Sequence, residues 1–191
     1  MVGVQPGSAA AQVTTALRTH QVGSVVFLGG WNGAVAVKAT ADQLQATSPG
    51  PDLFVAADQE GGAVQQLNGT GFSTLPSALR QGTLDPASLR KQAQGLAREL
   101  TAAGVNVDLA PVADTVATDF AGQNGPIGKY SRQFGSDPTA VADDVATVID
   151  GLQSTGVVAT AKHFPGLGRI SGNTDSTAAG ITDQTTSATD S

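Results

Sequence analysis

The sequence predicts an α/β protein in which short buried strands alternate with amphipathic helices. Five apolar segments have strand length: residues 1–4, 24–28, 53–57, 105–110 and 157–161. The last four are rich in Val, Leu and Phe with little polar alternation, which is typical of strands covered on both faces in a parallel sheet. Helical patterns separate them, so right-handed crossovers between parallel strands are expected. Such a repeat builds either an open doubly wound sheet or a (β/α)₈ barrel.

Four segments between the strands are predicted to be helices. Residues 85–104 and 137–156 carry apolar side chains at i, i+4, i+7, i+8 and i+11, which form one stripe along a helix. Both begin with Asp-Pro, where Asp can accept hydrogen bonds from free N–H groups and Pro gives up none. Both end at a glycine, which adopts a left-handed cap at no steric cost. Residues 8–20 and 34–47 repeat the scheme before the second and third strands.

Composition limits the classes of function. With 191 residues, 40% of them hydrophobic, the chain can form one domain with a sizeable core, and no apolar run is long enough to span a membrane. The net charge of −6 argues against binding of nucleic acid, whose phosphates require a basic face. The absence of cysteine and the presence of only His20 and His163 exclude thiolate and multi-histidine metal sites, so neither metal nor cofactor is expected. The amino terminus lacks a signal-peptide pattern, and compartment and oligomeric state stay open.

Three long polar segments follow the third, fourth and fifth strands: residues 58–81, 114–135 and 163–191. They lie at the carboxyl ends of the strands, which form the functional face in both architectures. From residue 174 onward the sequence is mostly Thr, Ser, Ala, Asp and Gly, and we expect a loop or a disordered end there. Any chemistry is therefore expected in these three segments.

The first polar segment opens with Asp58-Gln59-Glu60-Gly61-Gly62. Two carboxylates at a strand end can hold sugar hydroxyls or transfer protons, and the glycines permit a sharp turn or a close approach to a ligand. The alternative interpretation is structural: Asp58 caps the next helix and Glu60 is solvated. Spacing alone leaves both interpretations open.

The fifth strand ends in Lys162-His163-Phe164-Pro165-Gly166. A neighbouring Lys and His point to opposite faces of a strand unless the chain bends, and Pro165-Gly166 supplies a bend. A single histidine is more often structural than catalytic. Beside a lysine at the carboxyl end of a strand, however, we favour the functional interpretation.

Three further charged residues lie near the end of the fourth strand. Asp108 and Asp114 flank that end, and structural roles are favoured for both: one carboxylate is expected to face the barrel interior and the other to cap the loop. Arg132 lies in the following loop. Most loop arginines are solvated, so Arg132 by itself indicates little.

These motifs occur in one order along the chain: residues 58–62, residues 106–114 with a Leu-Ala-Pro-Val core, residues 132–138 and residues 162–166. Together they resemble the N-terminal barrel domain of glycoside hydrolase family 3, and most closely its NagZ-like branch of bacterial β-N-acetylglucosaminidases. The resemblance covers residues 1 to about 183. It favours the incomplete (β/α)₈ TIM-barrel type over the open sheet.

The resemblance also implies an activity and a sugar pocket. Members of the family are retaining exo-glycosidases. The aspartate that matches Asp58 holds hydroxyls of the terminal sugar, and the residues that match Arg132, Lys162 and His163 line the same pocket. The family is found both in the cytoplasm and at the bacterial cell envelope.

One departure concerns the loop after the fifth strand. In the NagZ-like branch this loop carries an Asp-x-His pair whose histidine is the general acid/base, and the matching residues here are Asp175-Ser176-Thr177. A threonine hydroxyl cannot relay a proton near neutral pH. The resemblance therefore leaves Asp175, or an unidentified neighbour on this loop, as the catalytic acid/base.

A second departure concerns length. A complete barrel takes about 250 residues and eight strands, whereas the sequence predicts only about five strand–helix units. The family's nucleophilic aspartate is expected after residue 191. Residues 1–191 are therefore expected to be a partial, truncated barrel domain.

The leading hypothesis is a glycosidase that hydrolyses terminal β-linked N-acetylglucosaminides of cell-wall sugars, with the 191-residue piece inactive alone. One alternative is a β-glucosidase of the same family, so the expected substrate ends in N-acetylglucosamine or glucose. The other alternative is a carbohydrate-binding remnant without catalysis. Asp58, Arg132, Lys162 and His163 are compatible with all three hypotheses.

Overall fold

The computed structural model describes residues 1–7, 10–177, 180–181 and 183. Its main sheet has five parallel strands in the order β1-β2-β4-β8-β9. Their bounds are Val2–Val4 for β1, Ser24–Phe27 for β2, Phe54–Ala57 for β4, Val107–Asp108 for β8 and Val158–Ala159 for β9. Each strand lies within one of the predicted apolar segments, so the five parallel strands are confirmed. Because the order follows the chain without a reversal, it matches part of a barrel rather than a doubly wound sheet.

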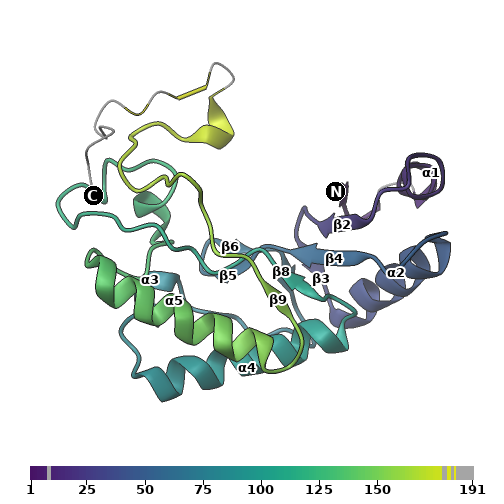
Figure 1. Cartoon of the computed structure of the whole chain (residues 1–191), viewed down its shortest axis with the longest axis horizontal. Coiled ribbons are helices and arrows are strands. Elements are labelled where there is room, and N and C mark those ends of the chain that lie inside the picture. The colour runs from purple at the N-terminus through teal and green to yellow at the C-terminus, as the bar shows by residue number, and fades with distance from the viewer. Residues whose placement is uncertain (8–9, 178–179, 182, 184–191) are drawn as a thin grey trace.

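Four helices alternate with these strands: α1 (Ala10–His20), α2 (Ala34–Thr47), α4 (Pro86–Ala102) and α5 (Pro138–Gln153). Neighbouring helices contact each other in chain order, and α4 and α5 lie side by side along one face of the sheet (Figure 1). Among the described residues, no helix has both the length and the apolarity needed to cross a membrane.

The ends of α4 and α5 follow from local chemistry. The Asp85 side chain accepts a hydrogen bond from the backbone N–H of Ser88 at 3.0 Å, and Asp137 does the same for Ala140 at 2.8 Å. Proline occupies the first turn of both helices. After the helices, Gly104 and Gly156 have φ of 77° and 86°, which favours glycine. The predicted helix starts and stops are therefore confirmed.

The two faces of the sheet differ sharply in exposure. Val25 pairs in register with Val55, and both side chains are 0% exposed beneath the helices. On the opposite face Phe54 is 57% exposed and Val158 is 45% exposed. Partners in a parallel register share a face, so the apolar core of this part of the chain lies between the sheet and its helices.

The segment of residues 58–81, expected to be a long polar loop, is in fact structured. It contains β5 (Gln59–Gly61), β6 (Val64–Gln65), β7 (Leu67–Asn68) and α3 (Ala78–Gln81). β5 and β6 form an antiparallel hairpin, and β7 pairs in parallel with β3 (Trp31–Asn32). The expectation was wrong because glutamine side chains replace a missing backbone partner here.

Gln59 illustrates that replacement. Its side chain is 1% exposed and bonds both the backbone N–H and the carbonyl of Leu67, at 3.0 and 2.8 Å. A polar sequence is thereby buried with its hydrogen bonds satisfied. Polarity alone is typical of a loop, so the hydrophobic pattern could not predict this hairpin.

A second, smaller apolar cluster lies beyond the carboxyl ends of β8 and β9. Val112, Val116 and Ile127 are each at most 1% exposed, and Phe120 and Leu167 pack against them. The cluster joins the segment after β8 to the segment after β9, two of the three segments in which chemistry was expected. Short 3₁₀ helices, η1 (Gly128–Tyr130) and η2 (Thr174–Ser176), interrupt these segments. Most of the predicted loop or disordered end after residue 174 lies outside the described residues.

Candidate active site

Charged side chains from three strand ends meet at the carboxyl edge of the sheet. Asp58 follows β4 directly, Arg132 lies in the segment after β8, and Lys162 and His163 follow β9. Lys162 and Asp58 are 104 residues apart in sequence, yet the Lys162 Nζ lies 2.5 Å from Asp58 Oδ1. The parallel order β4-β8-β9 places these three ends side by side and so creates the contact.

Glu60 connects the cations of this cluster. Its Oε1 lies 2.6 Å from Lys162 Nζ, and its carboxylate accepts two hydrogen bonds from Arg132, at 2.8 and 2.9 Å. The side chain of Glu60 is 2% exposed, so the alternative interpretation of a solvated surface residue is wrong. Asp58, Lys162, Glu60 and Arg132 therefore form one continuous chain of ion pairs.

The charges in this chain shift two pKa values. Burial alone would raise the pKa of Glu60, but the hydrogen bonds from Arg132 and the charge of Lys162 outweigh burial and hold this pKa below its usual range. Burial would lower the pKa of Arg132, but its hydrogen bonds to Glu60 and the charge of Glu60 raise it. Both groups are therefore ionised across the physiological pH range.

His163 is oriented by a carboxylate from a different strand end. The Asp114 Oδ2 lies 2.6 Å from His163 Nδ1, and the Asp114 side chain is 1% exposed. A carboxylate only accepts hydrogen bonds, so we assign the proton of this contact to Nδ1. Asp114 Oδ1 also accepts a hydrogen bond from Leu167 N at 2.6 Å, so Asp114 caps the loop after β9, whereas the expected cap was on the loop after the fourth strand.

Asp175 lies in η2, on the segment that follows His163. Its side chain is exposed, and its charge is one of those that raise the pKa of Arg132. The hydroxyl of Thr177 donates to the carbonyl of Asn173 at 2.9 Å. Thr177 thus stabilises the turn that carries Asp175.

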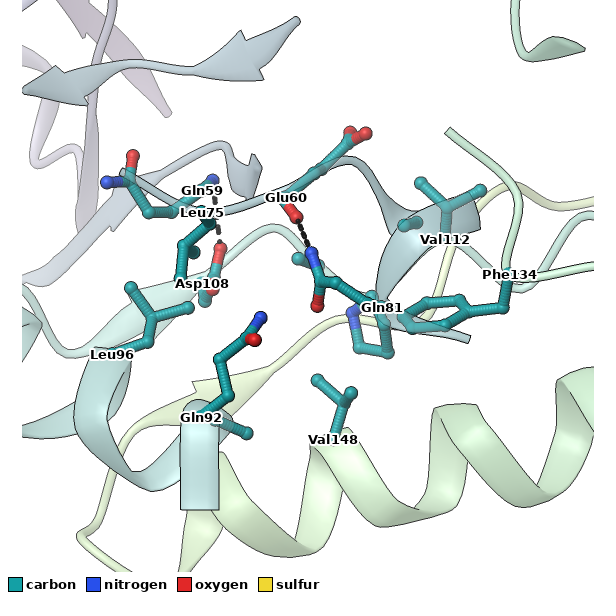
Figure 2. Close-up of a pocket in the computed structure, with 14 residues that line it drawn as sticks. Gln59, Glu60, Leu75, Gln81, Gln92, Leu96, Asp108, Val112, Phe134 and Val148 are labelled. Carbon is teal, nitrogen blue, oxygen red and sulfur yellow. Dashed lines mark hydrogen bonds between the residues drawn. The ribbon is translucent and has the colours of Figure 1, made fainter. Parts of the chain in front are cut away.

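Two hydrogen bonds from other segments fix the backbone of residues 59 and 60. The N–H of Gln59 donates to Asp108 Oδ1 at 3.1 Å, and Gln81 donates to the carbonyl of Glu60 at 2.8 Å. Figure 2 shows both bonds beside a cavity of about 20 Å³, with the Glu60 carboxylate directed away from it. The two carboxylates that flank Gln59 therefore have a fixed backbone.

Asp108 lies on the helix-covered side of the sheet, so it is not the carboxylate that was expected to face the barrel interior. Asp108 shares the cavity with Gln92 and Leu96 of α4, as Figure 2 shows. It is the register partner of Ala57, whose side chain also faces the helices. Burial raises the pKa of Asp108 to about 7, and the hydrogen bond from Gln59 only partly opposes this.

The site suits recognition of a neutral, polyhydroxylated ligand. Two carboxylates and two cations balance in charge and present fixed donors and acceptors. Within the part of the chain that the structure describes, no group of three His, Cys, Asp or Glu side chains is arranged to hold a metal ion. Sequence reasoning left the role of Glu60 open and favoured a structural role for Asp114, although the position of Glu60 two residues after Asp58 was a usable signal.

Comparisons with known proteins agree with this geometry. The family described as "Glycosyl hydrolase family 3 N terminal domain" matches residues 1–189. The β-hexosaminidase of Bordetella avium is 34% identical over 178 residues, which cover 89% of this chain and 49% of the relative. The chain therefore spans about half the length of the curated relatives it matches.

Solved structures give the same result. A β-N-acetylhexosaminidase from Beutenbergia cavernae is 44% identical with a TM-score of 0.88, covering 92% of this chain and 54% of that one. NagZ from Neisseria gonorrhoeae, solved with N-trifluoroacetyl-D-glucosamine, is 25% identical with a TM-score of 0.70, covering 87% of this chain and 50% of that one. These matches support the barrel-type fold, and the chain spans about half of each of these structures.

Proposed function

Because the chain belongs to glycosyl hydrolase family 3, as its N-terminal domain, we propose that it supplies the sugar pocket of a glycosidase. The proposed substrate carries a terminal β-linked N-acetylglucosamine. The relatives named β-hexosaminidase and the NagZ complex with an N-acetylglucosamine analogue support this choice of sugar. The single observation that carries the proposal is the chain of ion pairs from Asp58 through Lys162 and Glu60 to Arg132.

We assign the sugar-binding role to Asp58, Arg132, Lys162 and His163. The Asp58 side chain is 23% exposed, so it can accept hydrogen bonds from two sugar hydroxyls while Lys162 holds it in place. Lys162 and Arg132 donate, and His163 offers Nε2, since Nδ1 bonds Asp114. The ion pairs form before the sugar binds, so little reorganisation accompanies binding.

Catalysis by a retaining glycosidase needs two opposed groups, a nucleophile and a general acid/base. We assign the acid/base role to Asp175, whose carboxyl is exposed and whose charge contributes to the raised pKa of Arg132. No residue of this chain is proposed as the nucleophile. The 191 residues by themselves are therefore expected to bind sugar without appreciable turnover.

The test is calorimetric titration of the purified chain with N-acetylglucosamine and, separately, glucose. Asp58→Asn should weaken binding by about 10-fold or more, because a hydrogen bond to a charged group is stronger than one to a neutral group. Asp52→Asn is the matched control, since Asp52 is exposed near the other end of the same strand. Equal affinity of the two variants would refute the proposed pocket, and a preference for glucose would favour a β-glucosidase.

A carbohydrate-binding module without catalysis is the second candidate. It is favoured by Thr177, which occupies the place of the acid/base histidine and bonds a backbone carbonyl instead. Neither candidate predicts release of nitrophenol from an aryl N-acetylglucosaminide by the 191-residue chain alone, so any release would exclude the binding module. Robust release by the 191-residue chain would contradict the expected inactivity.

A further inference from the structure

Asn124 is a buried amide between two segments of the site. It is 0% exposed, and it lies in the segment that carries Arg132. Its Nδ2 donates to the carbonyls of Leu167 and Ile170, both at 2.8 Å. Its Oδ1 accepts from the N–H groups of Ile127 and Gly128, at 3.0 and 2.7 Å. An amide offers two donors and two lone pairs, so Asn124 uses its complete bonding capacity.

The accepting half of Asn124 shapes the turn that holds Arg132. Ile127 and Gly128 begin this turn, and the backbone N–H of Arg132 donates to the carbonyl of Ile127 at 3.2 Å. Arg132 Nη1 also donates to the carbonyl of Pro126 at 2.8 Å. The position of the Arg132 guanidinium therefore depends on the turn that Asn124 Oδ1 closes.

The donating half of Asn124 holds the other segment. Leu167 and Ile170 lie between His163 and Asp175, so their carbonyls attach this segment to the Arg132 side. The next residue, Gly125, donates to the carbonyl of Ser171 at 3.2 Å. A Cβ at Gly125 would lie 2.6 Å from that oxygen, so the two backbones touch without room for a side chain.

We propose that Asn124 is a positioning residue, which holds the segment of Asp175 against the segment of Arg132. The role assigned to Asp175 rests on the proposed function, whereas the connection between the segments does not. Asn124 contacts neither of the two charged side chains and acts through the backbone of both segments. Val116, Ile127 and Leu167 of the smaller apolar cluster add packing beneath this connection.

Two substitutions separate the halves of the amide. Asn124→Asp keeps an oxygen for Ile127 and Gly128 but loses both donated bonds, and it places a carboxylate against two carbonyls. Asn124→Ala loses all four bonds. We expect Asn124→Asp to release only the Asp175 side and Asn124→Ala to release both sides.

Amide hydrogen exchange followed by NMR measures this difference. In Asn124→Asp, exchange at Gly125 and Asp175 should accelerate by about 10- to 100-fold, while Ile127 and Gly128 stay protected. In Asn124→Ala all four amides should accelerate. The Arg132 Nε–H resonance, which reports the bond to Glu60, should keep its position only in Asn124→Asp.

Two further variants keep the test decisive. Gln123→Ala is the matched control, since Gln123 is the exposed neighbour, and it should change no exchange rate. Gly125→Ala leaves Asn124 intact but separates the backbones, so it should accelerate exchange at Asp175 as Asn124→Asp does. Uniform acceleration in both Asn124 variants, or none at Asp175 in Gly125→Ala, would overturn the proposal.

Sugar titration of the same variants distinguishes this proposal from the proposed function. Asn124→Asp should retain the affinity for N-acetylglucosamine within about twofold, because Asp58, Glu60 and Lys162 do not depend on the released segment. If the unsubstituted chain bound no sugar, the proposed function would fail. The exchange pattern would still test the role of Asn124 between the segments.

Discussion

Glu60 and Asp108 are two carboxyl groups buried at neighbouring strand ends, yet their pKa values shift in opposite directions. Glu60 faces Arg132 and Lys162, and its pKa is lowered. Asp108 accepts one hydrogen bond, from Gln59, and its pKa is raised to about 7. Among the described residues its Oδ2 has no hydrogen-bond partner. Burial opposes ionisation at both positions, so direct contact with cations decides the outcome.

The two pKa shifts distinguish the two sides of the sheet at its carboxyl edge: the side with the ion pairs, where a sugar is proposed to bind, and the side that faces the helices. The cations gather where a sugar is proposed to bind, and they fix an ionised Glu60 there. Asp108 lies among apolar side chains beneath the same backbone, where a neutral carboxyl is favoured. Neighbouring carboxyl groups whose pKa values are shifted in opposite directions are typical of functional sites.

The largest expected effect on stability follows from removing the negative charge of Glu60. Glu60→Gln keeps the shape of the side chain but leaves Arg132 and Lys162 buried without their shared anion. The free energy of unfolding should fall by about 3–5 kcal/mol, as when one partner of a buried pair is removed. Urea unfolding measures this loss, and affinity for N-acetylglucosamine should fall with it.

The control for this substitution is Gln65→Glu, an exchange in the opposite direction on β6 of the same hairpin. Gln65 bonds only backbone groups, so its variant tests whether any change in this hairpin disturbs the cations. A loss below about 1 kcal/mol in Glu60→Gln would mean that solvent, and not Glu60, stabilises the two cations.

The next effect is a pH dependence that originates at Asp108. Between its ordinary value near 3.8 and about 7, the folded state binds a proton that the unfolded state lacks. Asp108 therefore makes the free energy of unfolding decrease as pH rises through this window, and the decrease ends above it. Asp108→Asn should remove this contribution.

Urea unfolding of both forms at about pH 5 and about pH 8 measures the change. The difference between Asp108→Asn and the unsubstituted chain should shift in favour of the variant by about 2–4 kcal/mol between the two pH values, from a conversion of about 1.4 kcal/mol per pKa unit. A constant difference would show that Asp108 is already ionised at the lower pH.

The smallest effect is expected at an exposed carboxyl. Burial is absent at Asp85, and its pKa is lowered by hydrogen bonds from Ser88. Asp85→Asn keeps an oxygen acceptor at the start of α4, and Asn and Asp are equally good there. The melting temperature and the pH dependence above about pH 5 should match those of the unsubstituted chain. A clear change would mean that the charge itself, acting on the helix dipole, stabilises α4.

The scaffold was predictable because its signals are local. A helix needs only a 3.6-residue apolar period and a cap, and residues 85–104 show both. The five strands were found as short apolar runs. By contrast, the hairpin of β5 and β6 depends on a glutamine whose side chain bonds a strand eight residues later, and no periodic pattern records that.

The candidate site was only partly predictable. Asp58, Lys162 and His163 lie at the ends of predicted strands, so topology alone placed them at one edge. The sequence left the role of Glu60 open, because the cations that surround it are distant in sequence. Asn124 gave no signal, since its four bonds are all to backbone groups and depend on the path of two loops.

The long sequence separations within the ion-pair chain have a consequence for the order of folding. Arg132 meets Glu60 across 72 residues, and Lys162 meets Asp58 across 104. Contacts of such range form late, because the intervening chain must already be compact. During synthesis on the ribosome, Asp58 and Glu60 emerge long before either cation. The two carboxylates therefore remain in water until the segments that carry Arg132 and Lys162 dock against them.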